Sequence, residues 1–225
     1  MSRQRILEAL ADRIAAMQQP HPVRVAIDGI DAAGKTTLAD ALAETLVARG
    51  RVVIRASIDG FHRPRAERYQ RGADSPLGYY GDSFDYAALR EALLLPLGPG
   101  GSRRFRRAIF DAPSDSPLAA PAEEAPENAL LLVDGVFLLR PELADLWDYT
   151  IFVKIDFEVG LLRALQRDVS LFGSGEVVRQ RYLQRYYPGQ RLYLEEARPE
   201  QHANAIVENN DALHPSVMFA TEERR

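Results

Sequence analysis

The sequence predicts an α/β fold of three layers, in which helices cover both faces of a mainly parallel sheet. Two observations predict it. Short β-branched apolar runs alternate with segments of helical period along most of the chain. A glycine-rich turn also joins the first of these runs to the helix that follows it. With 225 residues, 46% of them apolar, the chain is long enough for one substantial domain, residues 1–225.

The first elements form a βαβ unit behind an N-terminal helix. A proline pair ends that helix, which we expect within residues 1–20. Its apolar positions at helical spacing are Ile6, Leu7, Leu10, Ile14 and Met17. The β-branched run 23–27 predicts the first strand. Residues 35–50 then predict a helix that ends at a glycine, and the run 52–54 predicts the second strand.

Three later apolar runs, 130–133, 150–155 and 205–207, predict further strands of the same sheet. Two stretches break the alternation. Residues 96–126 are rich in Pro, Gly, Ala and Ser, so we expect an excursion or hairpin over the sheet. Residues 212–225 lack a clear period, and we expect a loose tail there.

Composition excludes several classes of function. The net charge of −4 and a pI near 5.7 disfavour a nucleic-acid ligand, because such proteins normally gather a basic excess on one face. The absence of cysteine removes disulfides and thiolate metal sites. No apolar run approaches the roughly 20 residues that cross a bilayer, and the polar N-terminus does not resemble a signal sequence. We expect a cytoplasmic protein without a membrane partner; a homo-oligomer is left open.

Residues 29–36 form a glycine-rich turn between a strand and a helix. Such a turn aims backbone N–H groups at a phosphate, and the helix N-terminus adds a favourable dipole. Lys35 would reach the outer phosphates of ATP, and the Thr36 hydroxyl would hold Mg²⁺. The plain alternative is a turn that binds nothing. The candidate cofactor-binding residues are Gly29, Asp31, Ala32, Ala33, Gly34, Lys35, Thr36 and Thr37.

Two aspartates follow predicted strands at the sheet edge where the phosphates would lie. Asp134 ends the run 130–133, and it is our candidate for a second Mg²⁺ ligand, direct or through water. Asp59 follows the second strand, and it is our candidate for the base that accepts a proton from a substrate hydroxyl. For both, an ordinary Asp-Gly turn at a strand end is the alternative.

The chain resembles the uridine kinase and phosphoribulokinase group of P-loop kinases over roughly residues 23–210. Besides 29–36, three segments carry the resemblance: 59–63 (Asp-Gly-Phe-His-Arg), 134–136 (Asp-Gly-Val) and 163–168 with its Arg-x-x-x-Arg-Asp pattern. Residues 202–207 are also similar to the family's final strand. Their order and spacing together make the resemblance fairly specific.

The resemblance implies a five-stranded parallel sheet with a lid, and a hairpin over the acceptor site. It implies that Asp59 and Lys35 are catalytic and that Asp134 is a Mg²⁺ partner. It also implies that Arg163 and Arg167 are lid residues near the transferring phosphate, where a guanidinium can hold phosphoryl oxygens. An arginine-bearing solvated helix face is the alternative for these two.

The acceptor half departs from the family pattern. Tyr79 stands where uridine kinases carry an aspartate that binds ribose hydroxyls, and Ala164 replaces an arginine that also reaches the ribose. Asp82 could replace the first contact. The candidate substrate-binding residues are His62, Arg63, Tyr79 and Asp82. Aromatic side chains here, including Tyr79 and His62, could stack on a base or simply pack.

These features predict an ATP- and Mg²⁺-dependent kinase that phosphorylates a hydroxyl of a small molecule. The resemblance favours a nucleoside; a sugar phosphate or a pantothenate-like acceptor is the alternative. The basic run 103–107 could meet an anionic acceptor, but a solvated hairpin strand is the favoured interpretation. A nucleotide-driven switch or assembly ATPase is the rival from another class, although we find no clear signature of a water-positioning residue or a partner surface.

Overall fold

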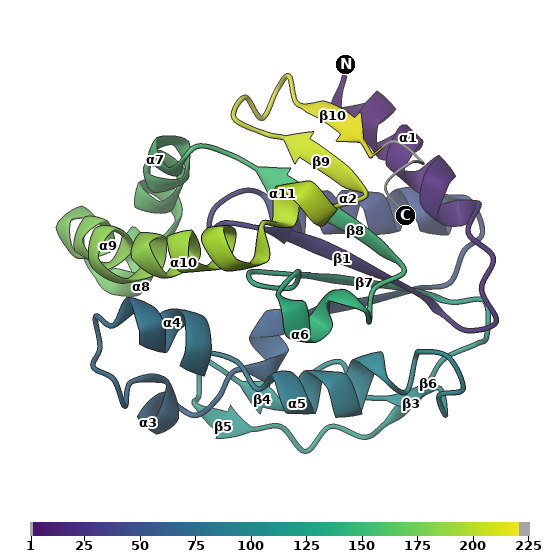
Figure 1. Cartoon of the computed structure of the whole chain (residues 1–225), viewed down its shortest axis with the longest axis horizontal. Coiled ribbons are helices and arrows are strands. Elements are labelled where there is room, and N and C mark those ends of the chain that lie inside the picture. The colour runs from purple at the N-terminus through teal and green to yellow at the C-terminus, as the bar shows by residue number, and fades with distance from the viewer. Residues whose placement is uncertain (1, 221–225) are drawn as a thin grey trace.

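A computed structural model describes residues 2–220 of the chain. A six-stranded sheet with the order β10-β9-β8-β1-β7-β2 forms its centre (Figure 1). Five strands run parallel; the edge strand β10 is antiparallel to β9. Their bounds are β1 Val23–Gly29, β2 Val53–Ser57, β7 Leu130–Gly135, β8 Tyr149–Lys154, β9 Ala205–Glu208 and β10 Ser216–Phe219.

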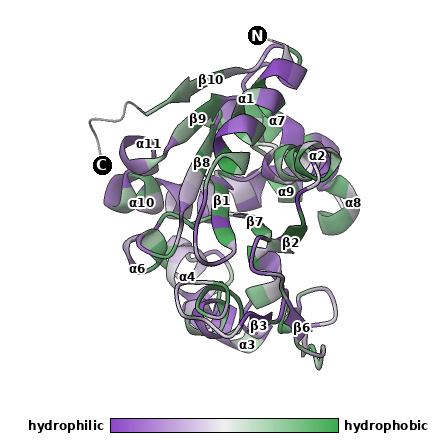
Figure 2. Cartoon of the chain, turned by 90° about the vertical axis from the view of Figure 1, so that its right-hand side faces the viewer, coloured by the Kyte–Doolittle hydropathy of each residue, from purple (hydrophilic) through white to green (hydrophobic). Residues whose placement is uncertain are grey.

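Helices cover both faces of the sheet because its strand residues alternate between two apolar clusters. Val25 and Ile27 of β1 pack with α1 (Arg3–Ala15) and α2 (Lys35–Ala48) on one side. Ala26, which lies between them, belongs to the cluster on the other side. That cluster contains residues of α4 Pro76–Asp82, α5 Tyr86–Leu89, η2 Arg90–Leu94, α6 Pro141–Ala144 and α10 Tyr187–Ala197. The hydrophobic residues therefore concentrate along the central strands (Figure 2), and the predicted three-layer fold is confirmed.

Smaller helices connect these layers. They are η1 Ile58–Phe61, α3 Arg65–Arg68, α8 Val169–Phe172, α9 Gly175–Arg181, η3 Tyr182–Tyr186 and α11 Pro199–His202. The helix α7 (Phe157–Arg167) follows β8 and carries both arginines of the predicted lid. The η3 segment is a single π-helical turn between α9 and α10, a feature that frequently marks functional sites.

The sixth strand corrects the sequence analysis. The tail 212–225 was expected to be loose, and the sheet to have five strands, but Ser216–Phe219 pairs with β9 in the register Val217↔Val207. Val217 and Phe219 pack against the α1 side of the core, and the Arg13 guanidinium lies 3.9 Å from the Phe219 ring centre. Four edge residues, of which only Val217 and Phe219 are partly buried, are too short a run to show a period. Residues 221–225 lie outside the described part.

The excursion 96–126 contains two pairs of short antiparallel strands. These are β3 Arg104–Phe105 with β6 Glu123–Glu124, and β4 Phe110–Asp111 with β5 Ser116–Pro117. They lie with α3 and α5 below the central sheet in Figure 1. The Ile109 N–H donates to the Gly60 carbonyl at 2.9 Å, which attaches the excursion to η1. Within the basic run, Arg107 pairs with Glu123 at 2.6 Å.

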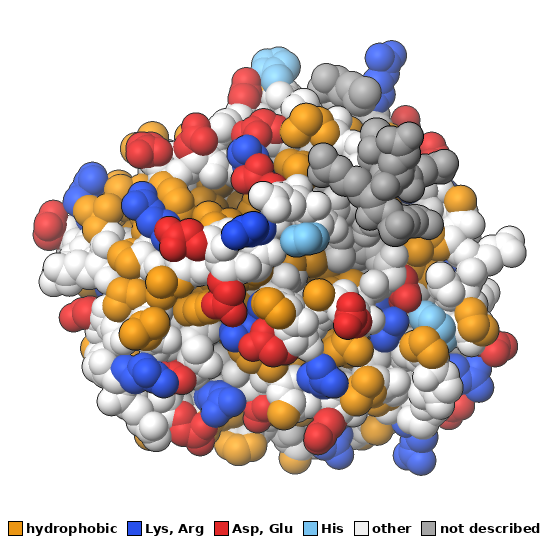
Figure 3. Space-filling view, viewed as in Figure 1, with side chains coloured by type: hydrophobic (Ala, Val, Ile, Leu, Met, Phe, Trp, Pro, Cys, Tyr) orange, Lys and Arg blue, Asp and Glu red, His pale blue; other side chains and the backbone are white. Residues whose placement is uncertain are grey.

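The surface agrees with the charge balance of the sequence. On the face shown in Figure 3, positive and negative side chains are interspersed. Among the described residues, no helix is both long and apolar enough to cross a membrane.

Candidate active site

The loop between β1 and α2 has the backbone of a phosphate-binding turn. Ala32 and Gly34 have positive φ angles of 59° and 92°, and Gly34 is the N-cap of α2. At Gly29 a Cβ atom would lie 2.3 Å from the carbonyl oxygen of Val153 on β8, so no larger residue fits there. The loop thus presents its amides at a helix N-terminus that lies tightly against the sheet.

Lys35 begins α2 and is only 9% exposed. Its Nζ donates to the Ile30 carbonyl at 2.8 Å, which holds the ammonium over the loop. Burial lowers the pKa of Lys35, and the carboxylates of Asp31 and Asp28 act in the opposite direction. The surrounding carboxylates thus favour the charged ammonium form of Lys35 against the effect of burial.

Thr36 and Asp134 meet at the end of β7, as the sequence predicted for a Mg²⁺ site. The Thr36 Oγ1 donates to Asp134 Oδ2 at 2.6 Å, and Arg55 Nη2 donates to Asp134 Oδ1 at 2.9 Å. Among the described residues, no cluster of three or more His, Cys, Asp or Glu side chains could hold a metal alone. One hydroxyl and one carboxylate oxygen fit Mg²⁺, which keeps several waters and shares phosphate oxygens with the protein.

Asp59 lies at the end of β2, in the η1 turn, with its N–H donating to Ser57 Oγ at 3.3 Å. His62 packs beside it: its Nδ1 is 2.9 Å from the Asp59 carbonyl oxygen and 3.9 Å from the carboxylate. Although 74% of the side chain is exposed, surrounding protein atoms raise the pKa of Asp59, and His62 acts against this. A raised pKa makes the carboxylate a stronger base.

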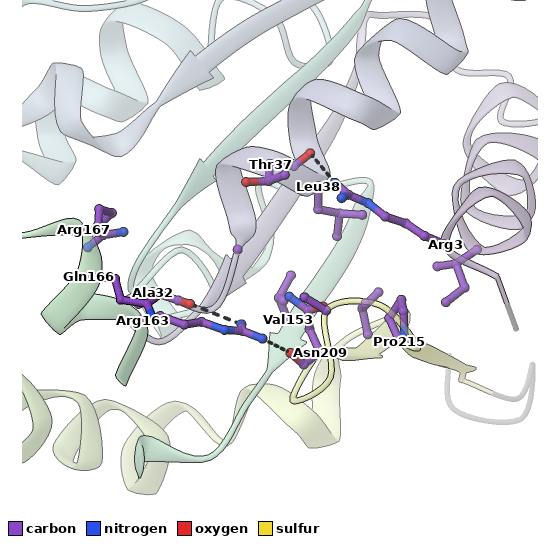
Figure 4. A pocket seen from close by; sticks show the side chains of 14 residues that line it. Arg3, Ala32, Thr37, Leu38, Val153, Arg163, Gln166, Arg167, Asn209 and Pro215 are labelled. Atoms are coloured by element: carbon purple, nitrogen blue, oxygen red, sulfur yellow. Dashed lines mark hydrogen bonds between the residues drawn. The ribbon is translucent and has the colours of Figure 1, made fainter. Parts of the chain in front are cut away.

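Two cavities meet at the phosphate loop. The first, of about 440 Å³, lies between the loop, α1, α7 and the segment after β9 (Figure 4). The second, of about 410 Å³, lies on the other side, between the ends of β2 and β7 and the helices α7 to η3. Ala32 and Arg167 line both cavities. The phosphate loop thus borders both cavities.

Arg163, one of the two arginines of the predicted lid, lines the first cavity. Its Nη2 donates to the carbonyls of Asn209 at 2.7 Å and Asn210 at 3.1 Å, and its Nη1 to Ala32 at 3.5 Å. Figure 4 shows the guanidinium between Ala32 of the loop and Asn209. Arg163 therefore lines the first cavity, and its role beside the transferring phosphate stays a prediction.

The N-terminal helix also reaches the first cavity, which sequence reasoning missed. Arg3 and Ile6 of α1 line it, as do Ala212 and Pro215 of the tail. The Arg3 guanidinium lies 3.5 Å from the carbonyl oxygen of Thr37 (Figure 4). No sequence signal could have found this, because the packing of α1 on α2 brings Arg3 to the loop.

The second cavity gathers most of the predicted site. Its lining includes Lys35, Thr36, Asp59, His62, Tyr79, Asp134 and Arg167. Arg63 and Asp82 do not belong to this lining, and their contact with substrate stays a prediction. Arg63 Nε donates to the Phe84 carbonyl at 3.1 Å, and Asp82 pairs with Arg71 at 2.8 Å. These local partners hold both side chains elsewhere.

The second cavity also contains residues that the sequence did not indicate. Tyr182 and Tyr186 enter from η3, whose π-helical turn changes the spacing of side chains along the helix. Asp168 is buried and accepts from Arg167 Nε at 2.6 Å and from the Tyr182 hydroxyl at 2.8 Å. The sequence shows a tyrosine-rich segment, but the π-helical turn decides which of its side chains point into the cavity.

Asp31 differs from the other loop residues in its contacts. Its carboxylate accepts from the Tyr79 hydroxyl at 2.8 Å and from Gln190 Nε2 at 2.6 Å. It lines the second cavity and not the first. Its side chain is thus directed to the second cavity, whereas the sequence predicts it among the nucleotide-binding residues.

The fold and this site define the class of P-loop kinases: a strand, a glycine-rich loop and a helix within a mainly parallel three-layer sheet. The model of the Phosphoribulokinase / Uridine kinase family matches residues 25–208. The chain belongs to this family, which confirms the resemblance seen in the sequence and makes the protein a phosphotransferase.

Individual relatives agree. The chain is 27% identical over 193 residues to a uridine kinase of Alkaliphilus metalliredigens (strain QYMF), covering 83% of this chain and 86% of that one. A Bacillus stearothermophilus structure named a possible uridine kinase superposes with a TM-score of 0.72 at 22% identity, over 90% and 97% of the two chains. A Silicibacter sp. TM1040 protein, assigned provisionally as a fructose transport system kinase, gives 0.72 at 23% identity, over 88% and 96%. The structural likenesses show the fold.

Proposed function

We propose that this protein transfers the γ-phosphoryl group of ATP to a hydroxyl of a small molecule, and that the acceptor is a nucleoside. The observation that carries the proposal is the second cavity, where Lys35, the Thr36–Asp134 pair and Asp59 face one space beside the phosphate loop. The uridine kinase relatives favour the nucleoside. A site built only to hold phosphates would not need the carboxylate of Asp59 on the acceptor side.

Each half of the reaction has its own residues. The nucleoside part of ATP would occupy the first cavity, and its phosphates would lie over the loop amides with Lys35 as the counter-charge. Mg²⁺ would be held by Thr36 and Asp134, where it neutralises phosphate charge. Asp59 would accept the proton of the attacking hydroxyl, and Arg167, which lines both cavities, would stabilise the transferring group.

A sugar phosphate acceptor held by the basic run 103–107 has less support. None of the residues that line the second cavity comes from the excursion 96–126. Arg107 is already paired with Glu123, which also reduces its use as an anion contact. The solvated-strand interpretation of this run is the one the geometry supports. A switch or assembly ATPase is likewise less supported, because it has no use for the second cavity.

The test is the variant Asp59→Asn, assayed by ADP release across a panel of nucleosides, sugars, sugar phosphates and pantothenate. We expect turnover on the best acceptor to fall about 100-fold or more, because a general base contributes about 10²- to 10⁴-fold, while ATP affinity is kept. The matched control is Asp145→Asn, an exposed aspartate that lines neither cavity. Unchanged turnover of Asp59→Asn would contradict the base assignment, and a wild type that phosphorylates nothing would contradict the function.

A further inference from the structure

The carboxylate of Asp31 is held in place by two buried side chains from two helices, α4 and α10, that pack against each other beside the second cavity. Tyr79 belongs to α4 and is 8% exposed, and Gln190 belongs to α10 and is 1% exposed. Both donate to the same oxygen, Oδ2, at 2.8 and 2.6 Å. An ionised carboxylate can accept about four hydrogen bonds, so the group keeps capacity for a ligand in the cavity it lines.

This arrangement is more than is needed to shape the phosphate loop. The backbone of the loop is already set by Gly29, Gly34 and the Asn209 amide, whose Nδ2 donates to the Ala33 carbonyl at 2.7 Å. The side chain of Asp31 takes no part in those contacts. Tyr79 stands where uridine kinases carry an aspartate, and its hydroxyl orients the carboxylate of Asp31 on the phosphate loop.

The charges of the second cavity favour an acceptor without negative charge. Its acidic lining residues are Asp31, Asp59, Asp134 and Asp168, and its Lys and Arg residues are Lys35 and Arg167. Arg167 is bonded to Asp168 at 2.6 Å, and Lys35 is placed for the phosphates of the donor. An anionic acceptor would therefore meet four carboxylates, while both cations of the lining already have partners, and like charges repel strongly in a partly desolvated site.

Much of the remaining lining of the cavity is aromatic. Tyr79 and Tyr186 lie with ring centres 4.8 Å apart, and His62 lies 4.5 Å from Phe84. All four line the second cavity. Such walls suit a planar or apolar group beside the hydroxyls of the ligand.

We propose that Asp31 is a specificity-determining residue that binds acceptor hydroxyls, and that the acceptor is an uncharged polyhydroxyl compound with a planar or apolar part. The inference rests on the proposed phosphoryl transfer and narrows its substrate class. It favours a nucleoside over a sugar phosphate or a pantothenate-like acid. The step itself is unchanged: the acceptor oxygen bonds to the γ-phosphorus, the bond to ADP breaks, and Asp59 takes the proton.

The experiment measures binding, which does not need turnover and so separates this inference from the kinase proposal. Calorimetry on the full chain, loaded with Mg²⁺ and a non-hydrolysable ATP analogue, compares uridine and cytidine with ribulose 5-phosphate and pantothenate. We expect a neutral nucleoside to bind at least 10-fold more tightly than either anion. In Asp31→Asn we expect nucleoside binding to weaken about 10-fold or more, since hydrogen bonds to charged groups are strong, with the affinity for the ATP analogue within about twofold.

Two controls keep the result interpretable. Asp74→Asn removes an exposed carboxylate outside both cavity linings, and we expect it to bind nucleosides like the wild type. Tyr79→Phe removes only the hydroxyl that orients Asp31, and we expect an intermediate loss. Nucleoside binding by Asp31→Asn equal to that of the wild type, a loss of ATP-analogue affinity as large as the nucleoside loss, or tighter binding of an anion would each overturn the inference.

Discussion

Asp28 lies directly under the phosphate loop as a fully buried carboxyl group on the central strand β1. Its Oδ1 accepts from the Gly29 N–H at 2.7 Å, and its Oδ2 accepts from the Leu139 N–H at 3.2 Å and from the Tyr193 hydroxyl. Burial raises the pKa of Asp28 from 3.8 to about 6, against the effect of these hydrogen bonds and of Lys35. Its protonation is therefore linked to the stability of the fold.

The sign follows from proton binding. Between pH 3.8 and about 6 the folded protein holds a proton on Asp28 that the unfolded chain releases, so the free energy of unfolding falls as pH rises through this window. Each pKa unit corresponds to about 1.4 kcal/mol, so a pKa difference of about two lowers the free energy of unfolding by about 3 kcal/mol over the whole window. Because the window is partly complete at pH 4.5, about 2 kcal/mol falls between pH 4.5 and 7.5.

The perturbation is Asp28→Asn, which keeps the shape of the side chain and removes its titration. Urea unfolding of wild type and variant at pH 4.5 and 7.5 measures both free energies of unfolding. Loss of the acceptor for the Leu139 N–H will lower the stability of the variant at both pH values. The quantity to compare is therefore the change in the free energy of unfolding between pH 4.5 and 7.5 in each protein. We expect the variant to gain about 2 kcal/mol relative to wild type on going from pH 4.5 to 7.5. Parallel pH profiles would refute the reasoning.

Two further predictions concern the loop and the N-terminal helix. Gly29→Ala should destabilise the fold by at least about 2 kcal/mol, because its Cβ would lie 2.3 Å from the Val153 carbonyl oxygen; urea unfolding checks this against Gly81→Ala, where a Cβ meets nothing within 4 Å. Arg3→Met should raise the KM for ATP about threefold or more and leave the KM for the acceptor unchanged, because Arg3 lines only the first cavity. Arg5→Met, on the same helix and outside the cavity, is its control; equal KM values for ATP in the two variants would contradict the role of Arg3.

Local patterns account for what could be predicted of the fold and site. The phosphate loop lies in consecutive residues, so Gly29, Lys35 and Thr36 carry their geometry with them. Asp59 and Asp134 were predicted together because the carboxyl ends of parallel strands share one edge of the sheet, and β2 does pair with β7 in the register Ser57↔Asp134. To predict the loop and the two aspartates, it is enough to know which segments are strands and that they run parallel, and the apolar runs indicate both.

Other parts of the site had no local signal. Arg163 and Arg167 are one helical turn apart on α7, yet the first is held by carbonyls of the segment after β9 while the second lines both cavities. Asp31 is oriented by partners 48 and 159 residues away. The edge strand β10 is stabilised by pairing with β9, and its four residues alone do not show a period.

By itself, the sequence determined the phosphate loop on the first strand of a parallel sheet and the carboxylates at the neighbouring strand ends. Only the tertiary structure decided the walls of the two cavities, where Arg3 lines the first, Asp31, Tyr182 and Tyr186 line the second, and Arg63 and Asp82 bond to local partners outside it. The physical reason is the range of the interactions. Loop and strand geometry depend on neighbouring residues, whereas the acceptor walls are set by helices that pack from distant parts of the chain.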